Sequence, residues 1–164
     1  YTQKLTTLGC EGYFINKKSQ AIQFDAKTFA SLDDTCGFFK AETTWFWLSC
    51  NFWWQDQHRV GLNLSQGEQP STDNSIWLDG VLYAVGEVVF EPLDEENWHV
   101  YSQDGRLNIR IETHWTRSEK INFRFSGSQF KQWQSKLTGQ IKVNDQVIDL
   151  NAEYGIFEQH ARKL

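Results

Sequence analysis

Apolar and polar residues alternate one by one along much of this chain. Residues 107–112 read Leu-Asn-Ile-Arg-Ile-Glu, and residues 121–126 read Ile-Asn-Phe-Arg-Phe-Ser. Successive side chains of an extended strand point to opposite faces of its sheet, so this alternation indicates strands that bury one face. The two segments are predicted to be neighbouring strands.

Short turn sequences separate the alternating segments. Asn and Asp tolerate left-handed backbone angles, and Gly adopts them at little cost. Reversals are predicted at Asp79-Gly80, at Asp104-Gly105, at residues 16–18, and at residues 144–146, where a tight turn makes a hairpin. The prediction is a set of about ten strands, read over residues 9–16, 20–24, 43–52, 60–64, 75–78, 82–90, 99–102, 107–115, 121–126, 134–143 and 147–161.

Consecutive strands joined by short turns predict an all-β fold. Such a meander closes well into an antiparallel β-barrel, which removes exposed sheet edges, and a β-sandwich is the alternative. At most one short helix is expected, over residues 26–32 after Asp25 as its N-cap. Residues 67–72 are predicted to be the one long loop.

The chain is long enough for a single domain with a large core. It has 164 residues, and aromatic residues make up 15% of them, including 8 Trp and 12 Phe. Each aromatic side chain buries about 150–250 Å², so no disulfide or metal is needed to hold the core. The chain contains no Met and begins at Tyr1, which predicts a fragment, a processed product or a domain of a longer protein.

Charge and hydropathy exclude two classes of partner. The net charge is −5, and the 16 Lys and Arg residues are scattered among 21 acids, so nucleic acid is not an expected partner. No apolar stretch approaches the ~20 residues of a membrane-spanning helix. Gly-rich phosphate loops, His-x-x-x-His pairs and nucleophile elbows are absent, so neither a metal nor a cofactor is predicted.

The three cysteines, Cys10, Cys36 and Cys50, are odd in number and have no metal-ligand spacing. They are expected to be reduced and buried, with one disulfide plus a free thiol as the alternative. Reduced thiols favour a cytoplasmic location.

Several phrases occur in an order that resembles a bacterial family of unknown function related in fold to AttH and to hydroxyneurosporene synthase, a carotenoid hydratase. The resemblance runs from about Gly9 to Arg162. The phrases are Asp34-Thr35-Cys36-Gly37, Thr44-Trp45-Phe46-Trp47, Gly61-Leu62-Asn63-Leu64, Asp73 to Gly80, Ser102-Gln103-Asp104-Gly105 and Gly155 to His160. The chain departs from the family pattern at Asp73, where Glu is usual, near Thr113, where Pro is usual, and at Trp133, where Gly is usual.

The resemblance implies a lipocalin-like barrel and a cavity for a lipophilic molecule. It also implies that residues 1–164 are one domain, the C-terminal half of a protein built from two lipocalin-like halves. The N-terminal half would then be a partner of this chain. The family has no established activity that the resemblance would carry over.

Glu158 and His160 are the candidate catalytic pair. Alternate residues of one strand share a face, which places their Cα atoms about 6.6 Å apart. A carboxylate beside an imidazole is able to move a proton, as hydration or isomerisation of an alkene requires. A structural network of hydrogen bonds that also includes Arg162 would explain the same residues.

Six further residues are candidates for ligand binding. Trp45 and Trp47 share a strand face, and with Trp77 they would wall a cavity or fill the core. Asn63 lies among apolar neighbours and needs a partner, either a ligand or a nearby turn backbone. Asp34 and Arg59 lie near matched phrases and would line a pocket, pair with one another, or remain at the surface.

Three hypotheses for function follow. The chain is a module that binds a lipid-like or isoprenoid-like molecule, an enzyme without a cofactor that hydrates, isomerises or cyclises such a molecule, or a structural half. Acid groups that converge in a cavity would favour the enzyme, an apolar cavity would favour binding, and a filled barrel would favour the structural role.

Overall fold

The computed structural model describes residues 2–36, 40–67, 72–122 and 126–163, and these residues form strands and turns without a helix. The all-β prediction is confirmed, and every pair of neighbouring strands is antiparallel. The strands are β1 (Thr2–Gly9), β2 (Gly12–Ile15), β3 (Ala21–Phe24), β4 (Phe29–Thr35), β5 (Glu42–Trp54), β6 (His58–Gly67), β7 (Ser75–Leu78), β8 (Val81–Ala84), β9 (Val88–Pro92), β10 (Asn97–Ser102), β11 (Leu107–Asn122), β12 (Gly127–Val143) and β13 (Gln146–Lys163).

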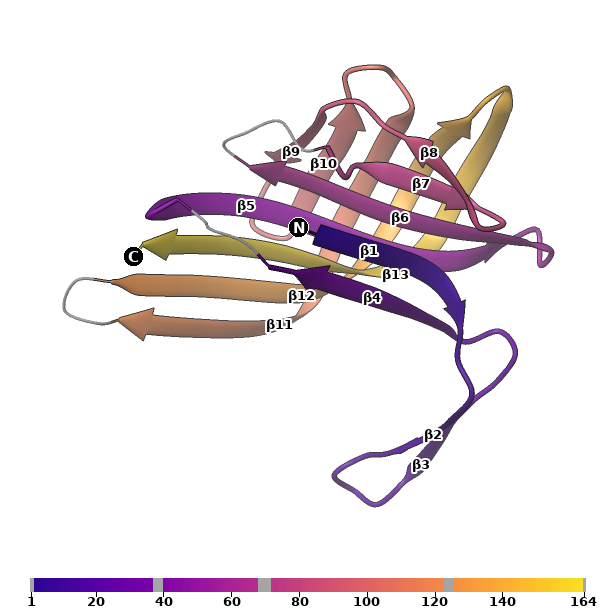
Figure 1. Cartoon of the computed structure of the whole chain (residues 1–164), viewed down its shortest axis with the longest axis horizontal. Coiled ribbons are helices and arrows are strands. Elements are labelled where there is room, and N and C mark those ends of the chain that lie inside the picture. The colour runs from indigo at the N-terminus through magenta and orange to yellow at the C-terminus, as the bar shows by residue number, and fades with distance from the viewer. Residues whose placement is uncertain (1, 37–39, 68–71, 123–125, 164) are drawn as a thin grey trace.

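Nine strands form one curled sheet in the order β8-β7-β6-β5-β13-β12-β11-β10-β9 (Figure 1). Chain neighbours pair with one another, and β5 pairs with β13, as in a meander that closes into a barrel. The opening lies between β8 and β9, which are consecutive in the chain. Across this opening the backbone amide of Phe90 in β9 donates to Gln66 Oε1 of β6, at 2.7 Å.

The concave face of this sheet, called the core face below, is filled with side chains. Phe157 lies at its centre, with ring centroids of Trp98 and Trp133 both 5.1 Å away and that of Phe90 5.6 Å away. Leu48, like Phe157, is fully buried. The opposite, convex face is called the outer face.

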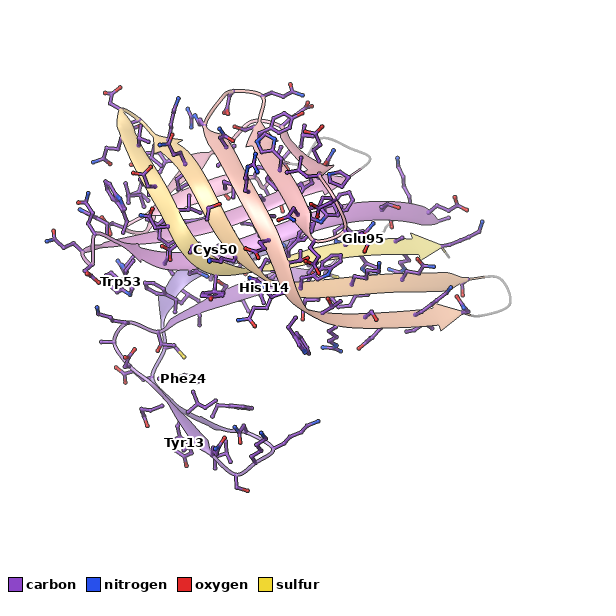
Figure 2. All side chains as sticks on the ribbon, turned by 180° about the vertical axis from the view of Figure 1, so that it is seen from behind. Tyr13, Phe24, Cys50, Trp53, Glu95 and His114 are labelled. Carbon is purple, nitrogen blue, oxygen red and sulfur yellow. The ribbon has the colours of Figure 1, made fainter. Side chains whose placement is uncertain are left out.

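A two-stranded ribbon of β1 and β4 lies over the outer face, in front of β5 and β13 (Figure 1). The Thr7 amide donates to Asn51 Oδ1 at 2.9 Å, and a Cβ added to Gly61 would lie 2.6 Å from Thr6 Cγ2. Glycine at position 61 therefore lets the ribbon approach the sheet closely. Between β1 and β4 the chain forms the β2–β3 hairpin, which projects away from the rest of the molecule (Figure 2).

The predicted turns are confirmed at two-residue hairpins. Leu78 pairs with Val81 around Asp79-Gly80, whose φ values are 52° and 84°, and Val143 pairs with Gln146 around Asn144, whose φ is 52°. Gly105 likewise has a positive φ, of 72°.

Residues 26–32, the one place where a short helix was considered possible, form a turn and the start of β4 instead. The Asp25 carboxylate does cap the following backbone, accepting from the Lys27 amide at 3.0 Å, and the Thr28 amide donates to the Asp25 carbonyl at 3.0 Å. The chain then leaves this single turn as strand β4, because pairing with β1 satisfies its backbone groups.

Two strand boundaries were also predicted wrongly. Residues 107–115 and 121–122 belong to one strand, β11, rather than to two, and residues 123–125 of the second predicted strand lie outside the described part. Residues 82–90 form two strands, because the Val85 amide leaves the sheet to donate to the Asn74 carbonyl, at 2.9 Å. Of the predicted loop at 67–72, residues 68–71 are not described.

Candidate functional site

Six of the eight candidate residues share the outer face of the sheet. Trp47 lies opposite Glu158 and Trp45 opposite His160 in the β5–β13 register. Asn63 of β6 lies opposite Ser49 of β5, and Trp77 of β7 lies opposite Gly61. Residues directly opposite in a ladder point to the same face, so these side chains form a single surface that the ribbon partly covers.

Asn63 and Trp47 form a buried polar pair under the ribbon. Trp47 Nε1 donates to Asn63 Oδ1 at 2.8 Å, and Asn63 Nδ2 donates to the Asp73 carbonyl at 2.9 Å. Both functional groups of the Asn63 amide therefore have protein partners, one of them a nearby turn backbone. Lys4 Nζ from β1 lies 5.3 Å from the Trp47 ring centroid, within the range of a cation–π contact.

Glu158 lies beside charged residues of the ribbon. Its Oε1 accepts from Gln132 Nε2 of β12 at 2.6 Å. Burial raises the pKa of the Glu158 carboxyl, the hydrogen bond from Gln132 lowers it in part, and the negative charge of Asp33 raises it further. Lys4 acts in the opposite direction, and Lys4 and Asp33 form an ion pair with one another. The net effect is a raised pKa, which shifts the Glu158 equilibrium towards the protonated form.

His160 has partners of its own. Its Nε2 lies 2.7 Å from Ser128 Oγ, and the ring centroid of Trp45 lies 4.2 Å from that of the imidazole. Burial lowers the pKa of His160, and the positive charge of Arg162 lowers it further. Within the described ranges no hydrogen bond joins His160 to Glu158, so the two groups share a face but act separately.

A groove of about 550 Å³ opens on the outer face next to Glu158. Its walls come from β4, β5, β11, β12 and β13, and both Trp47 and Gln132, the donor to Glu158, line it. Four aromatic side chains and Ile156 line it together with amide and hydroxyl groups and one lysine. The lining residues are Lys27, Phe29, Ser31, Trp47, Ser49, Cys50, Asn51, Trp115, Gln132, Gln134, Tyr154, Gly155 and Ile156.

Trp115 and Tyr154 are the most exposed aromatic residues of the groove, at 61% each. Trp115 lies at a β-bulge, where the β11–β12 register shifts between Thr113 and Thr116, next to the bend at His114 (Figure 2). Bulges redirect side chains and are frequent next to functional sites. Large aromatic rings that face water beside a groove are unusual outside binding surfaces.

Asp34 and Arg59 lie at the surface and apart from the groove. Asp34 of β4 is opposite Gln3 in the ribbon, and Arg59 of β6 is opposite Trp53. The structure shows no hydrogen bond or ion pair between them in the parts it describes. Arg59 instead lies beside Asp79, whose pKa is lowered first by a hydrogen bond from His58.

Four residues of this region were not identified from the sequence: Lys4, Asp33, Gln132 and Trp115. Lys4 precedes the first predicted strand, so nothing in its neighbourhood indicated a contact with Trp47. Trp115 continues the apolar odd-numbered positions of residues 107–111, so alternation alone would put it on the core face; the register shift between Thr113 and Thr116 is not visible in the pattern.

Groups of three or more side chains suited to holding a metal ion do not occur among residues 2–36, 40–67, 72–122 and 126–163. The same residues contain no helix long and apolar enough to cross a membrane.

Comparison with known proteins adds one assignment. No curated protein and no solved structure matches the chain significantly. A family model described as Domain of unknown function (DUF2804) matches residues 1–164, the whole chain, and the protein therefore belongs to this family.

Proposed function

We propose that the outer-face groove binds a lipophilic small molecule, of lipid-like or isoprenoid-like chemistry. The observation that carries this proposal is the pair of exposed rings, Trp115 and Tyr154, beside a groove of about 550 Å³. Small-molecule sites usually measure about 300–1,000 Å³ and combine apolar walls with a few polar groups. The core face is packed with its own side chains, which supports the outer face as the proposed binding side.

The groove offers apolar walls and an exposed polar group. Ile156 and Phe29 supply apolar walls. The amide of Gln134 is exposed and would orient a polar end of the ligand.

Tyr154→Ala tests the groove, with Tyr13→Ala as its matched control. Both tyrosines are similarly exposed, at 61% and 64%, but only Tyr154 lines the groove. We expect titration with a fluorescent polyene fatty acid to show binding that Tyr154→Ala and Trp115→Ala weaken about tenfold, or about 1.4 kcal/mol, and that Tyr13→Ala leaves unchanged. Equal effects of the three substitutions, or no binding by the parent protein, would contradict the proposal.

A second candidate function is acid catalysis by Glu158 on a molecule in the groove. It is favoured by the raised pKa of Glu158 and by Gln132, which lines the groove and donates to this carboxyl. A carboxyl that stays protonated is able to donate a proton to an alkene. Catalysis would then be lost as pH rises through the raised pKa of Glu158.

The state of Glu158 is measurable before any substrate is known. Carbon-13 NMR titration of the side-chain carboxyls should place the Glu158 midpoint above the ordinary value of about 4.3. Gln132→Leu should raise it further, since it removes a hydrogen bond that favours the carboxylate. A titration midpoint at or below the ordinary value would contradict acid catalysis by Glu158.

We propose further that the chain acts together with an N-terminal lipocalin-like half, as the family resemblance implies, and that this half covers the open side of the groove. Trp115 and Tyr154 would then be enclosed. Native mass spectrometry of the two halves together, searching for a bound lipophile, tests this arrangement. The remaining alternative, a purely structural half, predicts no bound molecule.

We also propose a cytoplasmic location for the protein. Cys10 and Cys50 are not joined by a disulfide, and Cys50 is buried, where desolvation raises the pKa of its thiol. Cys10 and Cys36 are more exposed than predicted. Fractionation of the cells that make the protein tests the location.

A further inference from the structure

The β2–β3 hairpin, with its flanking residues Glu11 and Asp25, forms an arm that projects away from the curled sheet (Figure 2). Its tip is well defined: Asn16 Oδ1 accepts from the backbone amides of Lys18, at 2.9 Å, and Gln20, at 3.0 Å. The turn of the arm is thus held by hydrogen bonds within the hairpin itself.

One face of the arm is apolar along its length. Phe14 lies opposite Ile22, with exposures of 54% and 49%, and Phe24 lies opposite Gly12. No polar side chain comes between these residues on that face. The other face carries Tyr13 and Ile15, but there the Gln23 side chain intervenes and donates to the Gly12 carbonyl at 2.7 Å.

An isolated two-stranded hairpin is at best marginally stable in water. It gains stability when further strands or a second layer cover its apolar face. A covering partner on the face of Phe14, Ile22 and Phe24 would therefore stabilise the arm.

The charges of the arm are separated from tip to base. Lys17 and Lys18 stand at the tip, while Glu11 and Asp25 stand at the base, and all four are exposed. Within the described ranges no ion pair engages Glu11, Lys17 or Lys18. An identical arm running in the opposite direction would set each basic tip against an acidic base.

We propose that the arms of two copies of this chain pack against each other antiparallel, about a two-fold axis, through the face of Phe14, Ile22 and Phe24. A two-fold contact uses the same patch on both subunits, and this patch is self-complementary in both charge and polarity. The open space above Gly12, where an added Cβ would meet nothing within 4 Å, leaves room for the partner's apolar side chains.

Charge argues against a membrane as the occupant. The arm has no net charge, with two Lys against one Glu and one Asp, so the whole −5 of the chain belongs to the body and would be repelled by anionic lipid. An open hairpin edge in hydrocarbon would also leave backbone groups without partners. A second copy satisfies both the apolar face and the charges.

Two arms bury a small area, below the roughly 1,200 Å² of a standard specific interface. The expected dimer is therefore weak and depends on protein concentration and on salt. The dimer does not rest on the function proposed for the outer-face groove.

Sedimentation equilibrium over a wide range of concentrations tests the proposal. We expect the parent chain to dimerise, Phe14→Ser to weaken the dimer about tenfold or more, and Tyr13→Ser, on the other face, to change it little. A parent chain that stays monomeric throughout would overturn the proposal. Monomers that instead bind anionic vesicles through Phe14 would identify a membrane as the occupant.

A charge exchange provides a second and independent readout. Lys17→Glu with Lys18→Glu, and separately Glu11→Lys, should each weaken self-association, because like charges then meet at tip and base. Mixing the two variants should give a heterodimer tighter than either homodimer. If the mixture associates no better than its components, the antiparallel pairing is wrong.

Discussion

The two candidate catalytic residues have different partners. Burial favours the neutral form of both, which raises the pKa of Glu158 and lowers that of His160. Glu158 has an amide donor and lies beside the groove, whereas His160 is held between Ser128 and the Trp45 ring. We infer that His160 has a structural role and that Glu158 is the better candidate for proton transfer.

Substitutions of His160 test its structural role. His160→Leu leaves Ser128 Oγ without its partner and should cost about 1 kcal/mol of unfolding free energy, while His160→Gln retains a polar partner and should cost less. Urea denaturation measures both. Equal stability of the two variants and the parent would show that this hydrogen bond contributes nothing.

The same residue gives a pH dependence with a definite sign. Because the folded pKa of His160 is lowered, the unfolded chain binds more protons just below its ordinary value of about 6.5. Stability should therefore fall as pH falls through that window, and His160→Gln should reduce this loss.

At the scale of strands, alternation predicted the part of β11 that buries one face and gave the wrong strand boundaries where β11 is solvated on both faces. Residues 107–113 alternate between buried and exposed, and this part of β11 was predicted. Residues 114–122 are exposed on both faces and extend as strand only because β12 pairs with them. Strand β4 is also mostly exposed, and the Asp25 cap before it is the signal that allowed a short helix over residues 26–32.

Gly139 is the glycine on which the β11–β12 pairing most depends. Its φ is +129°, and an added Cβ would lie 2.2 Å from the Asn108 carbonyl oxygen and 3.0 Å from Ile109 Cα, both in the backbone of β11. Gly139→Ala should cost more than about 3 kcal/mol or prevent folding. Gly80→Ala, with a positive φ but open space around it, is the control and should cost about 1–2 kcal/mol. Equal thermal stabilities of the two variants would show that close approach is unimportant at Gly139.

At the scale of the molecule, the sequence indicated a curled antiparallel sheet but not which face would carry the groove. Strand β5 has aromatic residues on both faces, with Phe46 towards the core and Trp45 and Trp47 outwards. When both faces of a strand are apolar, the local pattern does not show which of them points into the core. For β5 this depends on its pairing with β13, about 100 residues later in the chain. The ribbon that covers the outer face is likewise a product of the tertiary fold.

The arrangement of strands predicts an order of local stability, measurable by hydrogen–deuterium exchange. Strands β5, β12 and β13 have paired neighbours on both sides and should exchange most slowly. The β2–β3 arm, paired only with itself, should exchange fastest at low protein concentration, and strands β8 and β9, at the two sheet edges, should be intermediate. Raising the concentration should slow exchange in the arm alone, because dimerisation orders it without changing the sheet. Slow exchange in the arm at every concentration would contradict this order, since it would mean that the body of the same chain already covers the arm.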